Sequence, residues 1–484
     1  MGVTTVNWQG RFAILGWGVS GKASAHALVK RGAQLCAFDG RAREDDQSEN
    51  DANVEFVSEA DSDALAQAVI DWKPDCIVVS PGIPAHHPIF SAAKNAGIEL
   101  IGEVELAWRL QEDSEHAGRP WLCVTGTNGK TTTVGMLGAM LRAAGENAVE
   151  VGNIGLPICE AIDTDATVFA VELSSFQLHT VSTVSPLASV CLNVDADHLD
   201  WHGSAQAYAA DKAKVYHLTQ KACFYPASDI TVENMVAEAD VVEGARAIGL
   251  TLGIPSISQV GWVEDVLVER AFVEKRHMQA QFLAEVDDLR VAYHDGVTDA
   301  ARMDATAAAG LARAFGVPPE AVAQGLRSFT PAHHRRAVIS HAADVTWIDD
   351  SKATNAHAAV ASLSGITPGT AVWIAGGDTK GQEFGDLVAR VAPFLRGVVV
   401  IGKDRSAIVN ALRQRAPQVP FVEVDGHEDW MFSVVNEAVA LSRPGDTVVL
   451  APACASWDQF RSYAQRGDVF RDAVKRLEAN WAAQ

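Results

Sequence analysis

The sequence lacks the features that stabilise small secreted proteins or build small zinc domains. Its 484 residues include only seven cysteines, which lie far apart and form no C-x-x-C pair. Several stand inside apolar segments, so we expect buried, reduced thiols rather than disulfides or a zinc site. Low-complexity tracts and repeats are also missing. The length suits about three globular domains, at roughly 100–200 residues each.

Positive charge is scarce as well. The sequence has 39 lysines and arginines against 61 aspartates and glutamates, which gives a formal net charge of −22. Such a surface repels a long polyanion such as DNA, so we expect no nucleic-acid partner. A small anion held in a local basic pocket stays compatible with this charge.

Long apolar segments are the third absence. No stretch approaches the roughly 18 consecutive apolar residues of a membrane-spanning helix, and residues 1–11 lack the basic start and apolar centre of a secretion signal. We therefore expect no membrane insertion and a cytoplasmic protein.

The most informative stretch follows a short strand expected over residues 121–124. Its sequence is TGTNGKTT, residues 125–132, and a helical segment rich in alanine, leucine and methionine follows over 134–144. This order directs backbone N–H groups and a helix N-terminus at one point, while Lys130 adds a mobile charge and Thr131 a hydroxyl for Mg2+. The pattern predicts a loop for the phosphates of a nucleoside triphosphate. The alternative is an ordinary glycine turn, because Val124 stands where the usual phosphate loop has its first glycine.

Two further apolar strands, expected over 167–171 and 188–192, end in polar groups. A carboxylate such as Glu172, at a strand end beside a phosphate loop, suits the Mg2+ of a nucleotide, although it could instead cap the next helix. The polar loop 193–202 favours a metal or phosphate site over a simple solvated connection.

A helix expected over 205–218 carries Lys212 and Lys214, and the pattern alone places both lysines in solvent. A small-residue helix is expected over 305–315. Between 222 and 297 the pattern weakens into short candidate strands, such as 263–268, with several turns, and we assign no function there.

The N-terminal region carries a G-x-G-x-x-G pattern at Gly16, Gly18 and Gly21, between a strand expected over 12–15 and a helix that reaches 30. A second strand ends at Asp39, near the spacing of a dinucleotide-binding fold, so an NAD-dependent oxidoreductase is one candidate. The pattern itself explains only a pyrophosphate at a helix N-terminus, which any nucleoside diphosphate carries.

A third α/β region is predicted from strands that alternate with helical segments. These strands are expected over 345–348, 371–375, 398–401, 421–424 and 447–451. Polar segments follow three of them, and in a parallel sheet they should converge on one edge, unless they are three unrelated loops. These segments are 349–355, 376–380 and 452–460. We place domain boundaries at 1–102, 103–330 and 331–484.

The TGTNGKTT loop is similar to that of the Mur ligases, which build the stem peptide of peptidoglycan, and of the folylpolyglutamate synthases. Three more segments resemble the Mur ligases that add D-glutamate: ELSSFQL at 172–178, DSKATN at 350–355 and PACAS at 452–456. The resemblance covers essentially the whole chain. It implies an α/β fold with a Rossmann-like N-terminal domain, a P-loop-type central ATPase domain and a Rossmann-like C-terminal domain.

The resemblance also implies an activity and its ligands. ATP would activate UDP-N-acetylmuramoyl-L-alanine as an acyl phosphate, and D-glutamate would then form the amide in cytoplasmic peptidoglycan precursor synthesis. The implied cofactors are ATP and two Mg2+ ions, with Lys212 carbamylated by CO2. We expect a monomer. The other candidates are folylpolyglutamate synthase, against which the extra N-terminal domain argues, and a non-enzymatic Mur-like binding protein.

By matching position, the resemblance implies four overlapping sets of site residues. The ATP contacts would be Gly126, Thr127, Asn128, Gly129, Lys130, Thr131, Thr132, Asp304, Arg335, Asp350 and Lys352. The UDP-sugar contacts would be Trp17, Gly18, Val19, Ser20, Asp39, Gly40, Arg41, Gly82, Asn153 and His198. The D-glutamate contacts would be Thr354, Lys380, Ser456, Trp457 and Tyr463. The metal ligands would be Thr131, Glu172, His198 and Lys212, and the catalytic set Lys130, Glu172, His198 and Lys212.

The sequence departs from the enterobacterial pattern in the adenine region. A His-Asn-x-x-Asn stretch is replaced by Asp-Ala-Ala-Arg-Met-Asp at 299–304, so Asp304 keeps an acceptor but loses the donor of an amide. Tyr463 replaces a phenylalanine, and Trp17 a smaller apolar residue.

Overall fold

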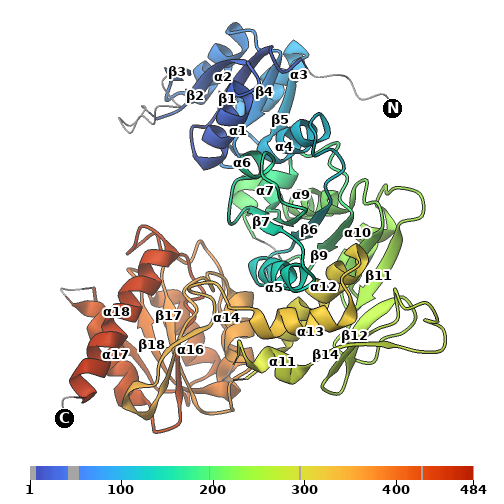
Figure 1. Ribbon diagram of the computed structural model, residues 1–484. Coiled ribbons are helices and arrows are strands. Elements are labelled where there is room, and N and C mark those ends of the chain that lie inside the picture. Colours follow the sequence, from blue (N-terminus) through green and yellow to red (C-terminus); the bar gives the residue numbers. More distant parts are fainter. Residues whose placement is uncertain (1–6, 42–53, 196, 294–295, 427–428, 483–484) are drawn as a thin grey trace. The chain divides into compact units, whose positions relative to one another are not determined.

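The structure is a computed structural model that describes residues 7–41, 54–195, 197–293, 296–426 and 429–482 (Figure 1). It divides into two compact units. The first comprises Met1–Glu285 with Met303–Ser328, and the second Val286–Arg302 with Phe329–Gln484. The described residues form three β-sheets, two in the first unit and one in the second. Each sheet lies within one predicted domain, whose exact boundaries stay a prediction.

The first sheet is entirely parallel, with the strand order β3-β2-β1-β4-β5. Its strands are β1 Arg11–Leu15, β2 Gln34–Asp39, β3 Glu55–Ser58, β4 Cys76–Val79 and β5 Glu99–Gly102. The helices around it, blue in Figure 1, are α1 Val19–Val29, α2 Ser62–Asp71, α3 Pro88–Ala96 and α4 Glu103–Glu112. Strands β1 and β4 are apolar and buried because helices cover both faces. This is the predicted Rossmann-like arrangement.

The second sheet has the order β14-β13-β12-β11-β10-β9-β6-β8-β7. Its strands are β6 Trp121–Thr125, β7 Ala148–Gly152, β8 Val168–Glu172, β9 Ala188–Cys191, β10 Ala222–Pro226, β11 Arg246–Leu250, β12 Gln259–Val263, β13 Val266–Glu269 and β14 Gln281–Glu285. The sheet is parallel from β7 to β12 and antiparallel from β12 to β14.

The helices of this region follow the strands in the chain. They are α5 Lys130–Ala143, α6 Ile158–Ala161, α7 Ser175–Leu178, α8 Leu199–His202, α9 Ala205–Ala213, the 3-10 turn Lys214–Tyr216, α10 Ile230–Ala237, α12 Asp299–Phe315 and α13 Pro319–Ser328. Helix α5 packs against α13, β7 and β8. Its fully buried face includes Val134, Leu137 and Met140.

Three sequence expectations for this region were wrong in detail. The single strand expected over 263–268 is a hairpin of β12 and β13, because Glu264 takes a left-handed conformation, with a φ of 55°, in the turn. Helix α9 ends at Ala213, where the chain tightens into a 3-10 turn that buries the ring of Tyr216. Helix α12 begins at Asp299 rather than at 305.

The third sheet has the order β15-β16-β20-β17-β18-β19 and is parallel except for β15. Its strands are β15 Ala337–Ser340, β16 Thr346–Asp349, β17 Ala371–Gly376, β18 Leu395–Ile401, β19 Phe421–Glu423 and β20 Thr447–Leu450. Five of them match the predicted strands, whereas the short edge strand β15 was not predicted.

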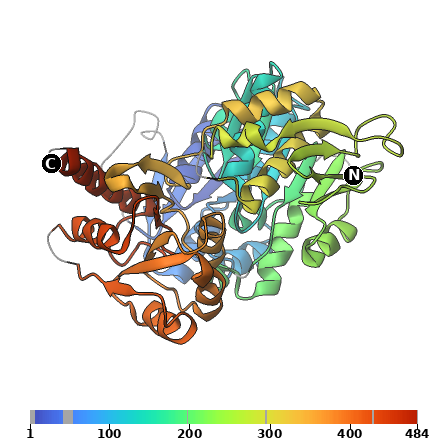
Figure 2. The ribbon, with the colours of Figure 1, turned by 90° about the horizontal axis from the view of Figure 1, so that it is seen from below.

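Helices cover both faces of the third sheet, and a separate apolar core fills each side. They are α14 Ala356–Leu363, α15 Gly385–Val391, α16 Ser406–Arg415, α17 Trp430–Leu441 and α18 Tyr463–Ala482, with the 3-10 turns Ala342–Asp344 and Ala392–Phe394. The second unit also contains α11 Val286–Arg290. Helix α18, dark red in Figure 2, packs against α17, β15 and β16.

Two predictions about what the chain lacks can be compared with the structure. All seven cysteines are buried, as expected, and all are free. Among the described residues, no helix combines the length and apolar character that crossing a bilayer requires.

Candidate active site

The predicted phosphate loop connects β6 to α5. Gly126 has a φ of 152° and Gly129 a φ of 85°, values that L side chains rarely adopt. A Cβ atom on Gly129 would lie 2.4 Å from Asp304 Oδ1, so the loop also has no room for a side chain there. Helix α5 begins at Lys130, and the loop therefore lies against a helix N-terminus, where anions bind.

Two lysines share one acceptor in this loop. Lys130 Nζ donates to the carbonyl oxygen of Gly126 at 2.7 Å, and Lys212 Nζ donates to the same oxygen at 2.8 Å. Lys212 is 1% exposed and also lies over the ring of Tyr208, 4.8 Å from its centroid. Burial, followed by the charge of Lys130, lowers the pKa of Lys212 to about 7. The expectation from the helix pattern that Lys212 is solvated was wrong.

Glu172, at the end of β8, contacts two other predicted site residues. Its Oε2 accepts a hydrogen bond from the Thr131 hydroxyl at 2.6 Å, and its Oε1 accepts one from Asn153 Nδ2 at 2.8 Å. The alternative role as a helix cap is excluded, because Ser174 caps α7 in a capping box with Gln177. A carboxylate next to a hydroxyl beside the phosphate loop is an oxygen donor set that suits Mg2+.

The loop after β9 holds the phosphate loop in place. The side-chain oxygen of Asn193 accepts a hydrogen bond from the backbone N–H of Asn128 at 2.9 Å, and its backbone carbonyl accepts one from the N–H of Thr127 at 3.0 Å. The hydroxyl of Thr127 lies 2.9 Å from the Tyr208 hydroxyl and accepts from the N–H of Asp195 at 3.0 Å. Neither Asn193 nor Tyr208 was predicted as a separate site residue, although Asn193 directly follows an expected strand.

His198 stands at the start of α8 with a φ of 51°. Its Nε2 lies 3.6 Å from Asp197 Oδ2, and its ring lies 4.8 Å from that of Phe176. Within the described part of the chain, no group of three or more His, Cys, Asp or Glu side chains is arranged to hold a metal. The metal sites thus stay predictions.

A second histidine of the same loop, His202, holds helices together. His202 Nδ1 lies 3.0 Å from Asp211 Oδ2, and its Nε2 lies 3.0 Å from the Ser175 hydroxyl. His179 contacts the same Asp211 oxygen at 2.8 Å. This network ties α7, α8 and α9 together around Asp211, the residue that precedes Lys212.

Asp304 lies beside the phosphate loop, on α12. Its Oδ1 accepts a hydrogen bond from the Thr133 hydroxyl at 3.3 Å. Thr132, which directly precedes Thr133 in the chain, is half-buried. The structure therefore brings Asp304 to the loop's edge, whereas an adenine contact stays a prediction.

The three glycines of the G-x-G-x-x-G pattern differ in what surrounds them. Gly16 has a φ of 93°, and a Cβ on Gly21 would lie 2.0 Å from the Gly16 carbonyl oxygen, so both are needed for the turn and for the packing of α1. A Cβ on Gly18 would meet nothing within 4 Å, so its backbone is open to a ligand. These are the roles expected of a pyrophosphate-binding turn at a helix N-terminus.

The other predicted UDP contacts surround this turn. Asp39 is 8% exposed and accepts from the backbone N–H of Trp17 at 2.7 Å and of Arg41 at 2.9 Å, so its carboxylate shapes the turn. The Arg41 side chain is 87% exposed, and Val19 and Gly40 are also exposed. Ser20 is half-buried in α1, and a Cβ on Gly82 would meet nothing within 4 Å.

The three polar segments of the third sheet do converge, as predicted. Strands β16, β20 and β17 are neighbours, so the segments that follow them leave the same edge. The N–H of Asp378 donates to the Ala455 carbonyl, and the N–H of Ala455 to that of Asp378, both at 2.9 Å. The N–H of Ala453 donates to the Ala353 carbonyl at 2.9 Å.

A residue that sequence analysis missed holds two of these segments together. Arg466, in α18, is 1% exposed, and its guanidinium donates to the hydroxyl of Ser351 at 3.0 Å and to the carbonyls of Ser351 at 2.9 Å and Cys454 at 3.1 Å. Burial lowers the pKa of Arg466 to about 10. No local pattern in α18 marks this arginine.

The predicted nucleotide contacts of the second unit lie near this edge. Burial raises the pKa of Asp350 to about 6, against the opposing effects of Ser362, Arg336 and Arg335. The N–H of Arg336 donates to Asp350 Oδ1 at 3.2 Å. Lys352 Nζ lies over the ring of Tyr463, 4.0 Å from its centroid.

The remaining predicted D-glutamate contacts differ in exposure. Ser456 is 3% exposed, Thr354 is half-buried, and Trp457 is 67% exposed. Lys380 is exposed and has a φ of 49°, and its N–H donates to Asp378 Oδ1 at 3.0 Å. The structure thus gathers polar groups of three segments at one edge of the third sheet.

The fold and the loop define a class of protein. A glycine turn that places a helix N-terminus and two lysines beside a carboxylate and a hydroxyl is suited to phosphates and Mg2+. On an α/β scaffold with Rossmann-like sheets, this indicates a nucleotide-dependent enzyme.

Comparison with known proteins gives the family. The chain matches "Mur ligase MurD-like, N-terminal domain" over residues 10–102, "Mur ligase middle domain" over 124–249 and "Mur ligase, glutamate ligase domain" over 334–454. The chain belongs to the Mur ligase family, which confirms the resemblance drawn from its motifs.

The relatives match over nearly their full length. The UDP-N-acetylmuramoylalanine--D-glutamate ligase of Streptomyces coelicolor is 48% identical to the chain, with 96% of the chain and 98% of that protein covered. The protein of the same name from Streptomyces avermitilis is 47% identical, with 98% and 100% covered. The structure of MurF ligase from Thermotoga maritima in complex with ADP has a TM-score of 0.57 at 15% identity and covers 98% of this chain and 100% of its own, which supports the fold.

Proposed function

We propose that this protein is an ATP-dependent ligase that joins D-glutamate to UDP-N-acetylmuramoyl-L-alanine in the synthesis of peptidoglycan precursors. The observation that carries this proposal is the 48% identity with a ligase of that name over 96% of the chain. The phosphate loop, the open pyrophosphate turn and the polar edge of the third sheet support it.

The proposed reaction has two steps. An oxygen of the L-alanine carboxylate attacks the γ-phosphorus of ATP, so that ADP leaves and an acyl phosphate forms. The amine of D-glutamate then attacks the acyl carbon, and inorganic phosphate leaves as the amide forms and the amine loses a proton. Both reactants of the first step are anions, so the site must neutralise their charge before attack.

Residues of the phosphate loop would bind ATP. The N–H groups of Gly126 to Thr132 and the N-terminus of α5 would surround the phosphates, and Lys130 would move from its loop carbonyls to the β- and γ-phosphates. Asp304 would face the nucleotide from α12. In the second unit, Arg335, Asp350 and Lys352 would supply further nucleotide contacts.

Two Mg2+ ions would neutralise phosphate charge and polarise the reacting oxygens. Thr131 and Glu172, already 2.6 Å apart, would hold the first ion. His198 and Lys212 would serve the second, with His198 also close to the acyl group. These roles define Lys130, Glu172, His198 and Lys212 as the catalytic residues.

We also propose that Lys212 is carbamylated. Its neutral amine would attack CO2 and lose a proton, which converts a cation into an anionic oxygen ligand. The low pKa of Lys212, about 7, makes the neutral amine available near pH 7. Carbamylation would also remove the repulsion between Lys212 and Lys130.

The two remaining substrates would bind at the glycine turn and at the third sheet. The UDP diphosphate would lie over Trp17 to Ser20, with Asp39, Gly40 and Arg41 near the uracil and ribose. Gly82, Asn153 and His198 would follow the sugar and its lactyl-alanine. Both carboxylates of D-glutamate would accept hydrogen bonds from the set Thr354, Lys380, Ser456 and Tyr463, with Trp457 alongside.

The domains would divide this work. Residues 1–102 would bind UDP, 103–330 would bind ATP, and 331–484 would contribute D-glutamate and nucleotide contacts. We propose that the protein acts as a monomer in the cytoplasm.

The test is phosphate release from ATP with Mg2+, bicarbonate and UDP-N-acetylmuramoyl-L-alanine, with D-glutamate, L-glutamate or no amino acid. Release that requires D-glutamate is expected. Release with L-glutamate alone would overturn the substrate assignment, and no release with any acceptor would overturn the proposed function.

A matched pair of variants tests whether phosphate release depends on the proposed Mg2+ site. Glu172→Gln should lose release, because it removes a charge from the proposed Mg2+ site. Glu160→Gln removes the same charge from an exposed position in α6 and should keep it.

A further inference from the structure

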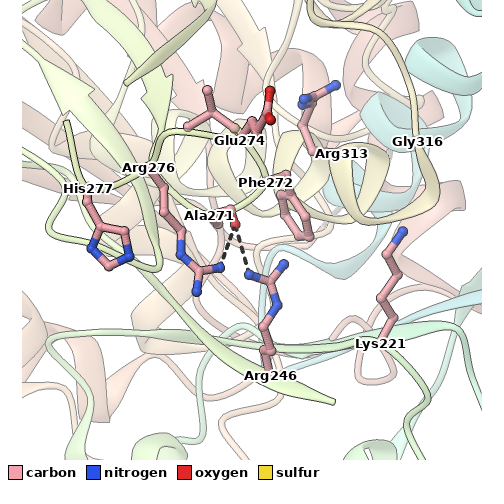
Figure 3. Close-up of a pocket in the computed structure, with 10 residues that line it drawn as sticks. Lys221, Arg246, Ala271, Phe272, Glu274, Arg276, His277, Arg313 and Gly316 are labelled. Carbon is pink, nitrogen blue, oxygen red and sulfur yellow. Dashed lines mark hydrogen bonds between the residues drawn. The ribbon is translucent and has the colours of Figure 1, made fainter. Parts of the chain in front are cut away.

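A basic depression is lined mainly by residues between 222 and 297, the region for which no function was predicted (Figure 3). Its volume is about 640 Å3, within the range of sites that bind small molecules. Its lining includes the cationic side chains Lys221, Arg246, Arg276 and Arg313 and one carboxylate, Glu274, with His277 and Phe272. In a chain with a net charge of −22, this concentration of cations is unusual.

The depression is separate from the phosphate loop. Lys221 directly precedes β10, and Arg246 is the first residue of β11, so both stand at the amino ends of their strands. The phosphate loop follows the carboxyl end of β6 in the same parallel part of the sheet. Strands of five residues separate the two edges by roughly 16 Å, at about 3.3 Å per residue.

Three of the four cations of the depression have no carboxylate partner in the described part of the chain. Within the described residues, Lys221, Arg246 and Arg276 form no salt bridge, whereas Arg313 Nη2 lies 3.4 Å from Glu269 Oε1. Arg313 Nε is buried with no hydrogen-bond partner among the described residues. Burial and then Arg246 and Arg313 lower the pKa of Lys221, so these charges are close enough to repel one another.

The backbone fixes this arrangement in advance of any ligand. The buried carboxylate of Glu269 accepts from the N–H groups of Ala271 at 2.6 Å and Phe272 at 2.7 Å and so shapes the loop after β13. The carbonyl of Ala271 then accepts from Arg246 Nη1 at 2.9 Å, as Figure 3 shows. The Arg246 guanidinium also lies over the Phe272 ring, 5.1 Å from its centroid. Arg246 therefore keeps its orientation, and its other donors can serve a ligand.

We propose that this depression is a binding site for a small metabolite that carries at least two phosphate groups. A guanidinium group can donate two parallel hydrogen bonds to two oxygens of one phosphate. Several cations without ion pairs are favourable in one place only when an anion neutralises them. A single phosphate carries at most about two negative charges and would leave part of this positive charge unmatched. A long polyanion is disfavoured, because the depression is local and the rest of the surface is strongly acidic. The proposal is independent of the ligase activity.

The test uses inorganic tripolyphosphate as the probe, because it has no base or sugar for other sites to recognise. Binding is measured by calorimetry in a Lys130→Ala background, which weakens the phosphate loop. We expect saturable binding that depends on Lys221, with an affinity that falls from tripolyphosphate to pyrophosphate to orthophosphate and weakens with salt. Replacing one cation should lower the affinity about tenfold.

Three variants in that background locate the site. Lys221→Gln changes an exposed side chain and should not disturb folding, whereas Arg246→Gln removes the guanidinium held by Ala271. Lys94→Gln removes an equal charge from the exposed surface of α3 and should bind like the background protein. Equal affinity in the Lys221→Gln and Lys94→Gln proteins would overturn the proposal. The proposal would also be overturned if binding is not saturable, or if orthophosphate binds as tightly as tripolyphosphate. It would likewise be overturned if a single-stranded DNA binds more tightly than tripolyphosphate and Lys221→Gln abolishes that binding.

Discussion

Replacing Lys212 with methionine should stabilise the folded protein, although it removes a proposed catalytic residue. Lys212 is 1% exposed and shares the Gly126 carbonyl with Lys130. Its charge therefore lies in the protein interior beside a second charge, which is unfavourable for the folded state. Methionine has a similar length and no charge to bury.

The size of this stabilisation follows from the pKa of Lys212. Burial and Lys130 lower the pKa of Lys212 from 10.5 to about 7. At about 1.4 kcal/mol for each tenfold change in the proton equilibrium, the charged lysine costs about 5 kcal/mol in the folded state. Loss of the hydrogen bond to Gly126 offsets about 1 kcal/mol of the gain. The unfolding free energy of Lys212→Met should thus exceed that of the unmodified protein by several kcal/mol at pH 7.

The stabilisation by Lys212→Met should decrease as the pH rises. The folded protein binds the Lys212 proton more weakly than the unfolded chain does. The cost is therefore fully present below pH 7 and disappears as the pH rises from about 7 to 10.5. By pH 9, the advantage of Lys212→Met should have fallen by about half or more.

The assay is chemical unfolding of both proteins at pH 7 and pH 9, in buffers purged of CO2 so that Lys212 stays an amine. Lys214→Met is the control, because Lys214 lies two residues away and forms an ion pair with Asp211 at 3.0 Å. That variant should lose stability slightly. A Lys212→Met protein that is less stable than the unmodified protein at pH 7, or equally stabilised at both pH values, would refute the reasoning.

Four further variants test other parts of the site. Lys130→Ala should abolish ATP turnover and keep UDP-sugar binding by calorimetry, and retained turnover would exclude Lys130 from phosphate binding. Gly18→Ala should fold normally and bind UDP at least tenfold more weakly, because only the space for a ligand is filled. Gly21→Ala should instead lose about 1–3 kcal/mol of stability, because its Cβ would lie 2.0 Å from the Gly16 carbonyl; equal thermal stability of the two glycine variants would contradict this. Arg466→Lys should raise the KM for D-glutamate about tenfold and leave that for the UDP-sugar unchanged, and equal changes in both would indicate a general structural role.

Local chemistry explains why much of the site could be predicted from the sequence. The phosphate loop, the glycine turn and the strands β6, β8 and β9 are each specified by a few adjacent residues. Glu172 and the polar segments of the third sheet could be placed because parallel strands bring their carboxyl ends to one edge.

Burial that depends on distant parts of the chain could not be predicted. Lys212 meets Gly126 across 86 residues, and nothing in its helix distinguishes it from Lys214. Arg466 meets Ser351 across 115 residues. The hairpin of β12 and β13 was missed because its turn residues, Glu264 and Asp265, interrupt a segment that otherwise has the pattern of one strand.

The acyl phosphate makes the most direct test of the proposed function possible. UDP-N-acetylmuramoyl-L-alanine labelled with 18O in both carboxylate oxygens is incubated with ATP, Mg2+, bicarbonate and D-glutamate, and the released phosphate is analysed by mass spectrometry. If the carboxylate attacks the γ-phosphorus, each phosphate released should contain one 18O atom, and the amide product should keep the other. Phosphate without 18O, with the amide product formed, would contradict activation through an acyl phosphate.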